Sequence, residues 1–425
     1  MRLAWFTPWP PDRHPAARRS RDIVRALAAR GDDITLVVAD EAVFATNRTV
    51  AGAPEGRIVT ATDYRTHGSG HDLAVYAVVN DAAGAFMWPT LVEQPGLTLL
   101  HDTNVHMLRA AGGAGAYRTE FVRNHPEVHA DAAELAVAGF EGAYESFWPM
   151  LRSVVETSRI LGVPTAAAAR DLQSRWPAAS IAIVTPGIEA PAPSDPSTRA
   201  ARRSALNLPD QAVVFGVVGA GDGSASSRSP TIVRAFAGTL GRVPHVRLLI
   251  AGMETDLAGQ PSAVRAAIAH VNPITEEERR HLMDAVDVLV DLHWPPAAGP
   301  SDPWLAGIAA GRPTIVLDTA AAADVPVFDP RSWRPPADGR EPVGVGVDIL
   351  DEDHSLRLAC YRLAVDSALR ERLGRAAHTY WAQTHTLGHM TAGVVRALDL
   401  AVAHQAATFS PPGQPERPTM QAKPC

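Results

Sequence analysis

The sequence predicts a two-domain α/β protein in which each domain is a doubly wound parallel sheet. Hydrophobic cores stop growing at about 250 to 300 residues, so a chain of 425 residues is expected to divide into domains. Short β-rich segments alternate with helical patterns on both sides of a proline- and serine-rich stretch near residue 190. This alternation is typical of βαβ units in parallel sheets. We expect Rossmann-like domains over residues 1–190 and 191–385.

The N-terminal domain is predicted to start with a strand, a crossover helix and a second strand. The helix covers Ala16–Arg30, where apolar residues recur at helical spacing on one face. Arg18, Arg21 and Arg25 share another face, which is either solvated or a contact for an anionic membrane surface. The strands are expected at Arg2–Phe6, Asp33–Ala39, Leu73–Val79 and Leu97–Leu100.

The same alternation restarts after residue 190 and predicts a second parallel sheet, with a helix at Thr231–Leu240. Its strands are expected at Ala212–Val218, Val246–Ala251, Val286–Leu292 and Pro313–Leu317. A last amphipathic helix within residues 386–404 finds no place on the completed second sheet, so we expect it to cross back and pack on the first domain. Its apolar stripe consists of Leu387, Met390, Val394 and Leu398. The proline-rich tail, residues 405–425, is expected to be disordered.

Composition excludes several classes of partner and chemistry. The net charge of -7 and the pI near 6.1 give no general attraction for a polyphosphate backbone, so nucleic acid is not an expected partner. Lys423 is the only lysine, so a phosphate must be held by arginine, backbone N–H groups or helix ends. The two cysteines cannot form a disulfide framework or a metal cluster. With neither a secretion signal nor an apolar run of about 18 residues, the expected location is cytoplasmic.

Ligands of open parallel sheets bind beyond the carboxyl ends of the strands. In the second domain, the loop after the first strand carries Gly219, Gly221 and Gly223 and ends near Arg228. It can cradle a diphosphate with its N–H groups and pair with it through the guanidinium. A nicotinamide dinucleotide is an alternative, but Ser224 replaces the third glycine of that fingerprint, and no acidic residue occurs from residue 224 to 253. A glycine-rich turn without a ligand is the other alternative.

Two loops of the first domain also follow predicted strands. The loop Pro8–Ala17 contains His14 and is either a rigid connector or part of a substrate site. The second loop places His101 at the carboxyl end of a strand, with Asp102 available to orient it, and a structural histidine is the alternative. His101 and His106 lack a third ligand at a suitable spacing, so no metal is expected.

Six segments carry a likeness to a known family: Met1–Pro11, Val79–Pro89, Gln94–Asp102, Val184–Ile188, Ala285–Pro295 and Ala309–Asp318. In this order they resemble bacterial family 4 glycosyltransferases, and the resemblance covers about residues 1–400. It implies the GT-B fold, with two Rossmann-like domains that face a cleft. It also implies retaining transfer of a sugar from a nucleoside-diphosphate sugar, commonly without a metal or other cofactor. The donor would bind the C-terminal domain and the acceptor the N-terminal domain.

The resemblance also implies roles for individual residues. His101 matches the histidine beside the transferred sugar, and with Asp102 it is the candidate catalytic group. Arg228 falls close to the lysine that usually holds the diphosphate, within a donor loop that contains Gly219, Gly221 and Gly223, and Asp324 matches an acidic residue of the donor site. The candidate acceptor-side residues are His14, Asn80, Asp81 and His106.

The sequence departs from the family at two donor-site carboxylates. Family members carry a pair of glutamates that hold the sugar hydroxyls and the nucleotide ribose. The corresponding positions here are Ala298 or Gly299 and Ala306, which have no carboxylate. Losing such hydrogen bonds costs on the order of 1 to 3 kcal/mol each. We expect a glycosyltransferase that acts on a glycan or a small-molecule acceptor. The alternatives are a binding or regulatory pseudoenzyme and, more remotely, a GT-B sugar epimerase.

Overall fold

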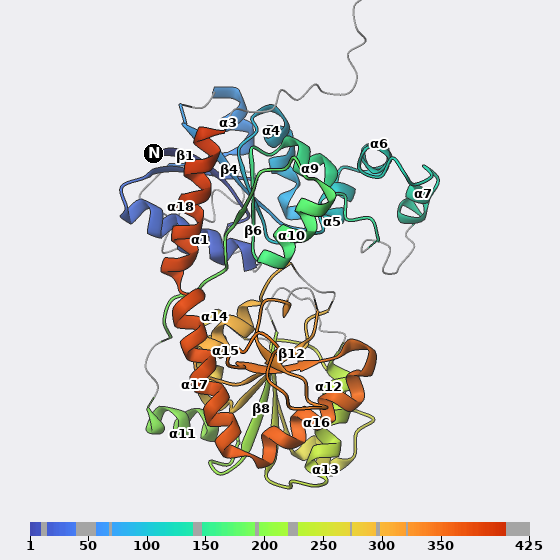
Figure 1. Cartoon of the computed structure of the whole chain (residues 1–425), viewed down its shortest axis with the longest axis vertical. Coiled ribbons are helices and arrows are strands. Elements are labelled where there is room, and N and C mark those ends of the chain that lie inside the picture. The colour runs from blue at the N-terminus through green and yellow to red at the C-terminus, as the bar shows by residue number, and fades with distance from the viewer. Residues whose placement is uncertain are drawn as a thin grey trace, which may run out of the picture.

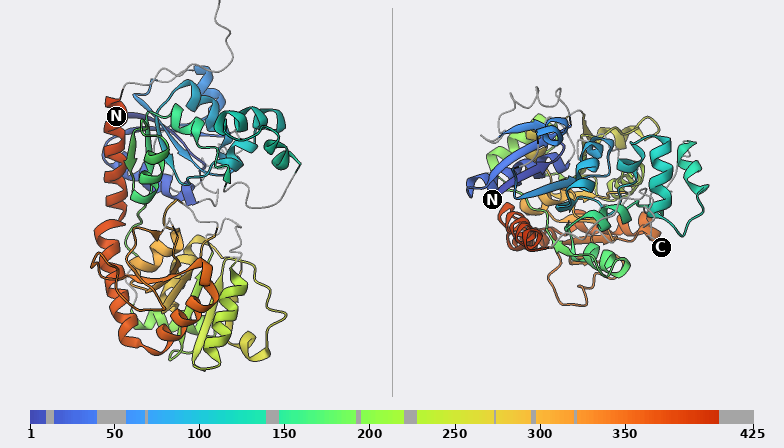
Figure 2. Two further views of the ribbon diagram at one scale, coloured as in Figure 1. Left: turned by 45° about the vertical axis from the view of Figure 1, so that its right-hand side comes forward. Right: turned by 90° about the horizontal axis from the view of Figure 1, so that it is seen from above.

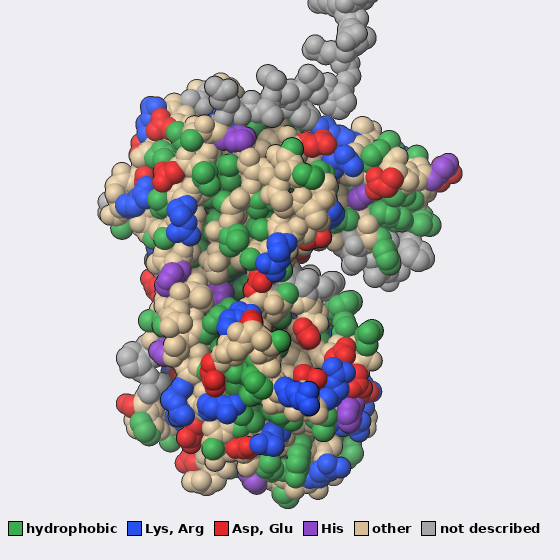
Figure 3. Space-filling view, in the orientation of Figure 1, with side chains coloured by type: hydrophobic (Ala, Val, Ile, Leu, Met, Phe, Trp, Pro, Cys, Tyr) green, Lys and Arg blue, Asp and Glu red, His purple; other side chains and the backbone are tan. Residues whose placement is uncertain are grey.

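The protein consists of two parallel sheets, each covered by helices on both faces, which lie one above the other along the long axis of the molecule (Figure 1). The computed structural model describes residues 1–9, 15–39, 57–67, 70–138, 147–191, 195–219, 228–272, 274–294, 298–319 and 322–404. The tail predicted to be disordered lies outside these residues. Figure 3 shows the domains as two lobes joined at a narrower waist.

The N-terminal sheet has seven parallel strands in the order β3-β2-β1-β4-β5-β6-β7. They are β1 (Arg2–Phe6), β2 (Asp33–Val38), β3 (Ile58–Thr60), β4 (Leu73–Val78), β5 (Leu97–Leu100), β6 (Ile160–Val163) and β7 (Ile181–Ile183). The helices around them are α1 (Pro15–Ala29), α3 (Ala61–His67), η1 (Ala82–Met87), α4 (Trp88–Glu93), α5 (His106–Ala110), α6 (Ala114–Asn124), α7 (Ala132–Val137), α9 (Arg152–Thr157) and α10 (Ala166–Arg175). The prediction of β1, β2, β4 and β5 is confirmed, whereas β3, β6 and β7, of three or four residues each, were not predicted.

Apolar residues fill both faces of this sheet, because each face is covered by helices. In β1, Leu3 and Trp5 belong to the core beneath α1, while Ala4 and Phe6 belong to the core on the opposite face. All four are fully buried. Burial on both sides explains why the strand reads as a continuous apolar run rather than as an alternating pattern.

The C-terminal sheet repeats this plan with seven parallel strands in the order β10-β9-β8-β11-β12-β14-β13. They are β8 (Val213–Val218), β9 (Val246–Ala251), β10 (Ile268–Val271), β11 (Val288–Asp291), β12 (Thr314–Leu317), β13 (Val327–Phe328) and β14 (Gly344–Val347). The helices are α11 (Pro196–Ala205), α12 (Ser229–Leu240), α13 (Ser262–Ala266), α14 (Glu276–Ala285), α15 (Asp302–Ala309), η3 (Ile349–Asp351), α16 (Glu352–Val365) and α17 (Ser367–Thr384). The predicted doubly wound fold class is confirmed in both domains.

Each sheet has a point where consecutive connections turn to opposite faces, and such points are where ligands of parallel sheets bind. In the N-terminal sheet this point lies between β1 and β4, and in the C-terminal sheet between β8 and β11. Helix α12, after β8, packs in the core of one face, whereas α15, after β11, packs in a cluster with α17. The segments that follow β8 and β11 therefore flank the expected ligand edge of the C-terminal domain.

The last helix, α18 (Leu387–Ala403), crosses back to the N-terminal domain as predicted. Met390, Val394 and Leu398 are buried in the same core as Leu3 and Trp5 of β1. Helix α17 remains on the C-terminal domain, where it contacts α15 and α16. Figure 2 shows α17 and α18 following one another along one side of the molecule. Burial of a large apolar side chain contributes about 1.5 to 3 kcal/mol, so the crossing is well anchored.

The two chain segments that connect the domains run side by side. The Ile188 N–H donates to the His385 carbonyl (3.0 Å), and the Leu387 N–H donates to the Ile188 carbonyl (2.9 Å). A Cβ atom on Gly187 would lie 2.2 Å from the Thr386 carbonyl oxygen, so only glycine permits this close approach. The paired segments form a two-stranded connection at the hinge between the domains.

His385 is buried at this connection. Its Nδ1–H donates to the Pro186 carbonyl (2.7 Å), and its ring packs edge-to-face on Trp304 with 5.4 Å between ring centroids. Burial lowers the pKa of His385 to about 4, with smaller contributions in the same direction from Arg19 and His389. The ring is therefore neutral in the folded protein at pH 7.

Protonation of His385 should destabilise the protein between about pH 6.5 and about pH 4. The unfolded histidine takes up its proton near pH 6.5 and the folded one near 4, so the unfolded state binds more protons in this window. The free energy of unfolding should fall by on the order of 3 kcal/mol as pH is lowered across it. Urea unfolding from pH 7.5 to 4.5 should show this decrease in the wild type and a weaker one in His385→Gln. His245→Gln, at an exposed position, is the control; an H385Q variant with the wild-type pH dependence would contradict the assignment.

Candidate functional site

The carboxyl-end loops of the two sheets meet around Asp302, at the first turn of α15. Arg18 Nη2 donates to its Oδ2 (2.8 Å) and Arg19 Nη2 to its Oδ1 (2.7 Å), and the Nε atoms of both arginines donate to the same oxygens. Arg19 also donates to the Pro300 carbonyl (2.9 Å). Two guanidinium groups of α1, in the N-terminal domain, thus hold one carboxylate of the C-terminal domain, with one carboxylate oxygen for each arginine.

This contact is shielded from water, with 11 to 13% of the three side chains exposed. Burial by itself raises the pKa of Asp302, but the charges of Arg19 and Arg18 outweigh it and hold that pKa well below its usual value. Of the three arginines expected to share a face of α1, Arg18 pairs with Asp302 and Arg21 with Asp22 (2.9 Å), whereas Arg25 is exposed.

The loop before α15 makes a second contact with the N-terminal domain. The Thr165 hydroxyl donates to the Ala298 carbonyl (3.1 Å). A Cβ atom on Gly299 would lie 2.6 Å from Pro164 Cβ, so the Gly299 backbone packs directly on the Pro164 ring of the N-terminal domain. Ala298 and Gly299, where the resemblance led us to expect a sugar-binding glutamate, thus form part of the domain interface.

Asp324, a predicted donor-site residue, forms a third contact between the domains. Its Oδ2 accepts the N–H of Ala167 at the start of α10 (2.9 Å), and its Oδ1 accepts Arg170 Nη2 (3.1 Å). A carboxylate at a helix N-terminus is stabilised by the unpaired N–H groups and the positive helix end. The structure thus gives Asp324 a connecting position between the domains.

The predicted phosphate-binding segment lies at the ligand edge of β8. Gly219, directly after β8, lies so close to the residue after β9 that a Cβ atom would be 2.5 Å from the Gly252 carbonyl oxygen. Gly221 and Gly223 lie outside the described residues. Arg228 lies directly before α12 and pairs with Glu352, the first residue of α16. The structure therefore places a carboxylate on the guanidinium that was predicted to hold a diphosphate.

Glu352 and Trp294 complete this group around Arg228. The Glu352 side chain is 10% exposed, and burial raises the pKa of its carboxyl although Arg228 opposes the rise. The Arg228 guanidinium lies 5.1 Å from the ring centroid of Trp294, which follows β11 and is 38% exposed. The segments after β8, β11 and β14 thus meet at one place.

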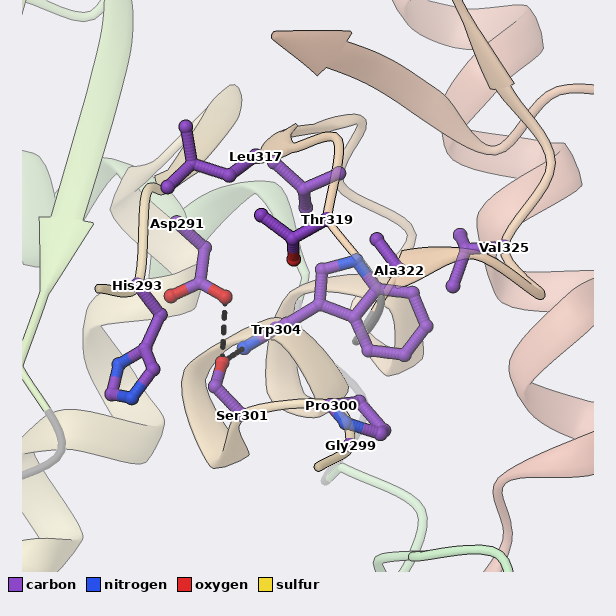
Figure 4. A pocket seen from close by; sticks show the side chains of 11 residues that line it. Asp291, His293, Gly299, Pro300, Ser301, Trp304, Leu317, Thr319, Ala322 and Val325 are labelled. Atoms are coloured by element: carbon purple, nitrogen blue, oxygen red, sulfur yellow. Dashed lines mark hydrogen bonds between the residues drawn. The ribbon is translucent and has the colours of Figure 1, made fainter. Parts of the chain in front are cut away.

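A pocket lies between the carboxyl ends of β11 and β12 and the start of α15 (Figure 4). Asp291, the last residue of β11, accepts the Ser301 hydroxyl through Oδ2 (2.7 Å). Burial raises the pKa of Asp291, against the opposing effect of His293. Ser301 Oγ in turn accepts the Trp304 N–H (3.0 Å), which caps α15 and fixes the hydroxyl. Thr319 also lines this pocket.

The N-terminal candidates lie at the carboxyl ends of β4 and β5, and three of them accept hydrogen bonds from backbone N–H groups there. Asn80 Oδ1 accepts the Met107 N–H (2.8 Å) at the start of α5, and Asp81 caps η1. Asp102 accepts the Asn104 N–H (3.1 Å) in a local turn. His101 directly follows β5, and its backbone N–H donates to the Val78 carbonyl (3.1 Å). These residues share one edge of the sheet, next to its switch point.

His106 and His14 stand apart from this group. His106 is 1% exposed, and its ring nitrogens bond to the Trp148 carbonyl (2.7 Å) and the Tyr117 hydroxyl (3.0 Å). Because both nitrogens are used inside the N-terminal domain, the structure gives His106 a packing role. His14 lies outside the described residues.

Sequence reasoning missed Arg19, Asp302, Asp291 and Glu352. Two signals pointed to some of them. Ser301 followed by Asp302 and Pro303 is a typical helix start, and Asp291 is a polar residue at the end of a strand predicted to be buried. The partners of these residues have no local signal, since Arg18 and Asp302 are 284 positions apart. Among the described residues, no helix is both long and apolar enough to cross a membrane.

Comparison with known proteins gives structural relatives only. No protein-family profile matches the sequence, and no curated protein matches it. The fold is similar to a glycosyltransferase from Rickettsia africae ESF-5, with a TM-score of 0.59, 10% identity, and 94% of this chain and 98% of that chain covered. It is similar to Anabaena Alr3699/HepE in complex with UDP and glucose, with a TM-score of 0.60, 13% identity and 94% and 99% coverage. It is also similar to WaaG, a glycosyltransferase involved in lipopolysaccharide biosynthesis, with a TM-score of 0.57, 15% identity and 94% and 99% coverage. The predicted GT-B fold is confirmed.

Asp302→Asn should loosen the contact between the domains. The substitution leaves two arginines without their shared charge, and breaking a shielded ion pair costs about 3 to 5 kcal/mol. We expect a lower free energy of unfolding and a larger radius of gyration in small-angle scattering. Asp22→Asn removes an ion pair within α1 and should leave the radius of gyration unchanged. A D302N protein with the wild-type radius of gyration would show that this contact does not set the domain positions.

Proposed function

We propose that this protein is a glycosyltransferase that moves a sugar from a nucleoside-diphosphate sugar to a glycan or a small-molecule acceptor. The observation that carries the proposal is the apposition of the two carboxyl edges, which brings the ligand sides of two parallel sheets together around Asp302. The solved structures similar in fold support it, since they include named glycosyltransferases and complexes with UDP.

In the proposed reaction, the bond between the anomeric carbon and the diphosphate oxygen breaks, and an acceptor hydroxyl oxygen bonds to that carbon. The hydroxyl proton is released, and the nucleoside diphosphate leaves. On the model of family 4 enzymes, the configuration at the anomeric carbon is retained and no metal is needed. His101 would lie beside the transferred sugar, with the acceptor against the N-terminal edge of Asn80 and Asp81.

The diphosphate is proposed to bind at the N-terminus of α12. This helix has 12 residues, and its positive end favours an anion by about 0.3 to 1 kcal/mol per charge interaction. Arg228 lies directly before the helix, paired with Glu352. A diphosphate and the Glu352 carboxylate carry the same sign, so they compete for this guanidinium.

Substitutions in this ion pair should change nucleotide affinity in opposite directions. Arg228→Ala should weaken UDP, GDP or ADP binding roughly tenfold or more, because it removes a charge-assisted hydrogen bond. Glu352→Gln should strengthen binding several-fold, since it removes the competing charge. The neighbouring pair Arg234 and Asp353 joins the same two helices and provides the controls Arg234→Ala and Asp353→Asn. Titration calorimetry measures all four, and an R228A protein that binds every tested nucleotide as well as wild type would refute the diphosphate site.

Turnover separates the glycosyltransferase from a binding protein of the same fold. We expect release of nucleoside diphosphate from a nucleotide-sugar when an acceptor is present. His101→Ala should abolish this release and leave nucleotide affinity within about twofold, because its proposed place is beside the sugar. His129→Ala, at a surface position with 83% of the side chain exposed, is the control. Tight nucleotide binding without release for any tested donor and acceptor would favour the pseudoenzyme alternative.

A further inference from the structure

The pocket beside Asp291 contains a carboxylate oxygen that is open to a ligand. Asp291 Oδ2 is occupied by the Ser301 hydroxyl, and none of the residues that the structure describes donates a hydrogen bond to Oδ1. In Figure 4 this second oxygen is turned towards the His293 side of the pocket. Asp291 is partly buried, and a ligand hydroxyl that donates to this oxygen would form a charge-assisted hydrogen bond with the carboxylate.

The hydrogen-bond pattern fixes Asp291 as an acceptor. Ser301 has one hydroxyl hydrogen, which it donates to Asp291, while its oxygen accepts the Trp304 N–H. The cap holds the Ser301 oxygen in place, so the hydrogen bond that this hydroxyl donates orients the Asp291 carboxylate. The carboxylate is therefore held in one orientation before any ligand arrives, which lowers the entropy that binding must overcome.

The rest of the pocket suits a ligand with both hydroxyl groups and apolar faces. Thr319 adds a second polar side chain from the end of β12, and Trp304, Leu317 and Val325 line the apolar side. A pyranose ring has this combination, with hydroxyl groups at its edge and C–H groups on its faces. A carboxylate or phosphate in the same place would meet the like charge of Asp291 at close range.

The pocket also lies next to the proposed diphosphate site. His293 lines the pocket, and Trp294, the next residue, is the ring against which the Arg228 guanidinium lies. Consecutive Cα atoms are about 3.8 Å apart, so the pocket and the proposed diphosphate site adjoin at His293 and Trp294. A donor that spans both would have its diphosphate near α12 and its sugar in the pocket.

We infer that Asp291 is a specificity-determining residue that accepts a hydroxyl of the donor sugar and selects a neutral hexose over a uronic acid. The inference rests on the proposed function, since it assigns the sugar part of the same donor. It places sugar recognition on a strand-end aspartate of β11, in a chain that lacks the paired glutamates of family 4.

Paired ligands test this selection. UDP-glucose should bind wild type about tenfold more tightly than UDP and than UDP-glucuronic acid, as expected for a hydrogen bond to a charged group and for repulsion between two carboxylates. GDP-mannose, GDP and GDP-mannuronic acid form a second series, and ADP-glucose and ADP a third. Asp291→Asn keeps the shape of the side chain and should bring the members of each series to within about threefold, with the affinity for the free nucleotide unchanged.

Asp318→Asn is the matched control. It removes a carboxylate directly after β12, the strand next to β11, and this carboxylate does not line the pocket. It should keep the wild-type preference. Two results would overturn the inference alone: a wild-type protein that binds free nucleotides but gains nothing from the hexose, or an Asp291→Asn protein that keeps the full preference. A protein that binds no nucleotide or nucleotide-sugar at all would overturn the proposed function as well. Thermal unfolding of each variant confirms that the comparison is made on folded protein.

Discussion

The pairing of Arg18 and Arg19 with Asp302 is a shielded ion-pair contact that links the two domains at the ligand edges of their sheets. A guanidinium is planar and donates along fixed directions, so two of them on one carboxylate define an orientation as well as a distance. Since the arginines belong to the helix after β1 and the carboxylate to the helix after β11, the contact aligns the switch-point sides of both sheets. The contacts of Ala298 and Asp324 with the N-terminal domain extend the same interface.

Carboxylates take two different parts in this arrangement. Asp302 and Asp324 connect the domains. Asp302 pairs with two arginines, and Asp324 binds an arginine and a helix N–H group. Asp291 and Glu352 lie at the C-terminal ligand edge and keep raised pKa values because burial outweighs their partners. This edge therefore has acidic groups although Ala298, Gly299 and Ala306 carry none, and they come from the end of β11 and the start of α16.

The sequence allowed the fold to be predicted because its evidence is local. Continuous apolar runs marked β1 and β8, and the stripe of Met390, Val394 and Leu398 indicated a helix that needed a second surface. The site was harder, because its contacts join distant positions. No residue near Arg228 in the sequence indicates that its guanidinium will pair with Glu352, 124 positions later. The donor-site role that the resemblance implied for Asp324 likewise gave no indication that it would contact α10. The positions of these residues at strand ends predicted which edge of each sheet binds ligands. They did not predict which side chains would pair with one another at that edge.

The crossing of α18 also constrains the order in which the chain can fold. The core beneath β1 includes Met390, Val394, Ala397 and Leu398, so the N-terminal domain is built from both ends of the described chain. During synthesis, α1 covers only part of that face of the first sheet until α18 has left the ribosome, by which time all strands of the second sheet have been made. The domain that is translated first is thus the one completed last. A fragment that stops before α18 lacks part of its core even though it carries every strand of the N-terminal sheet.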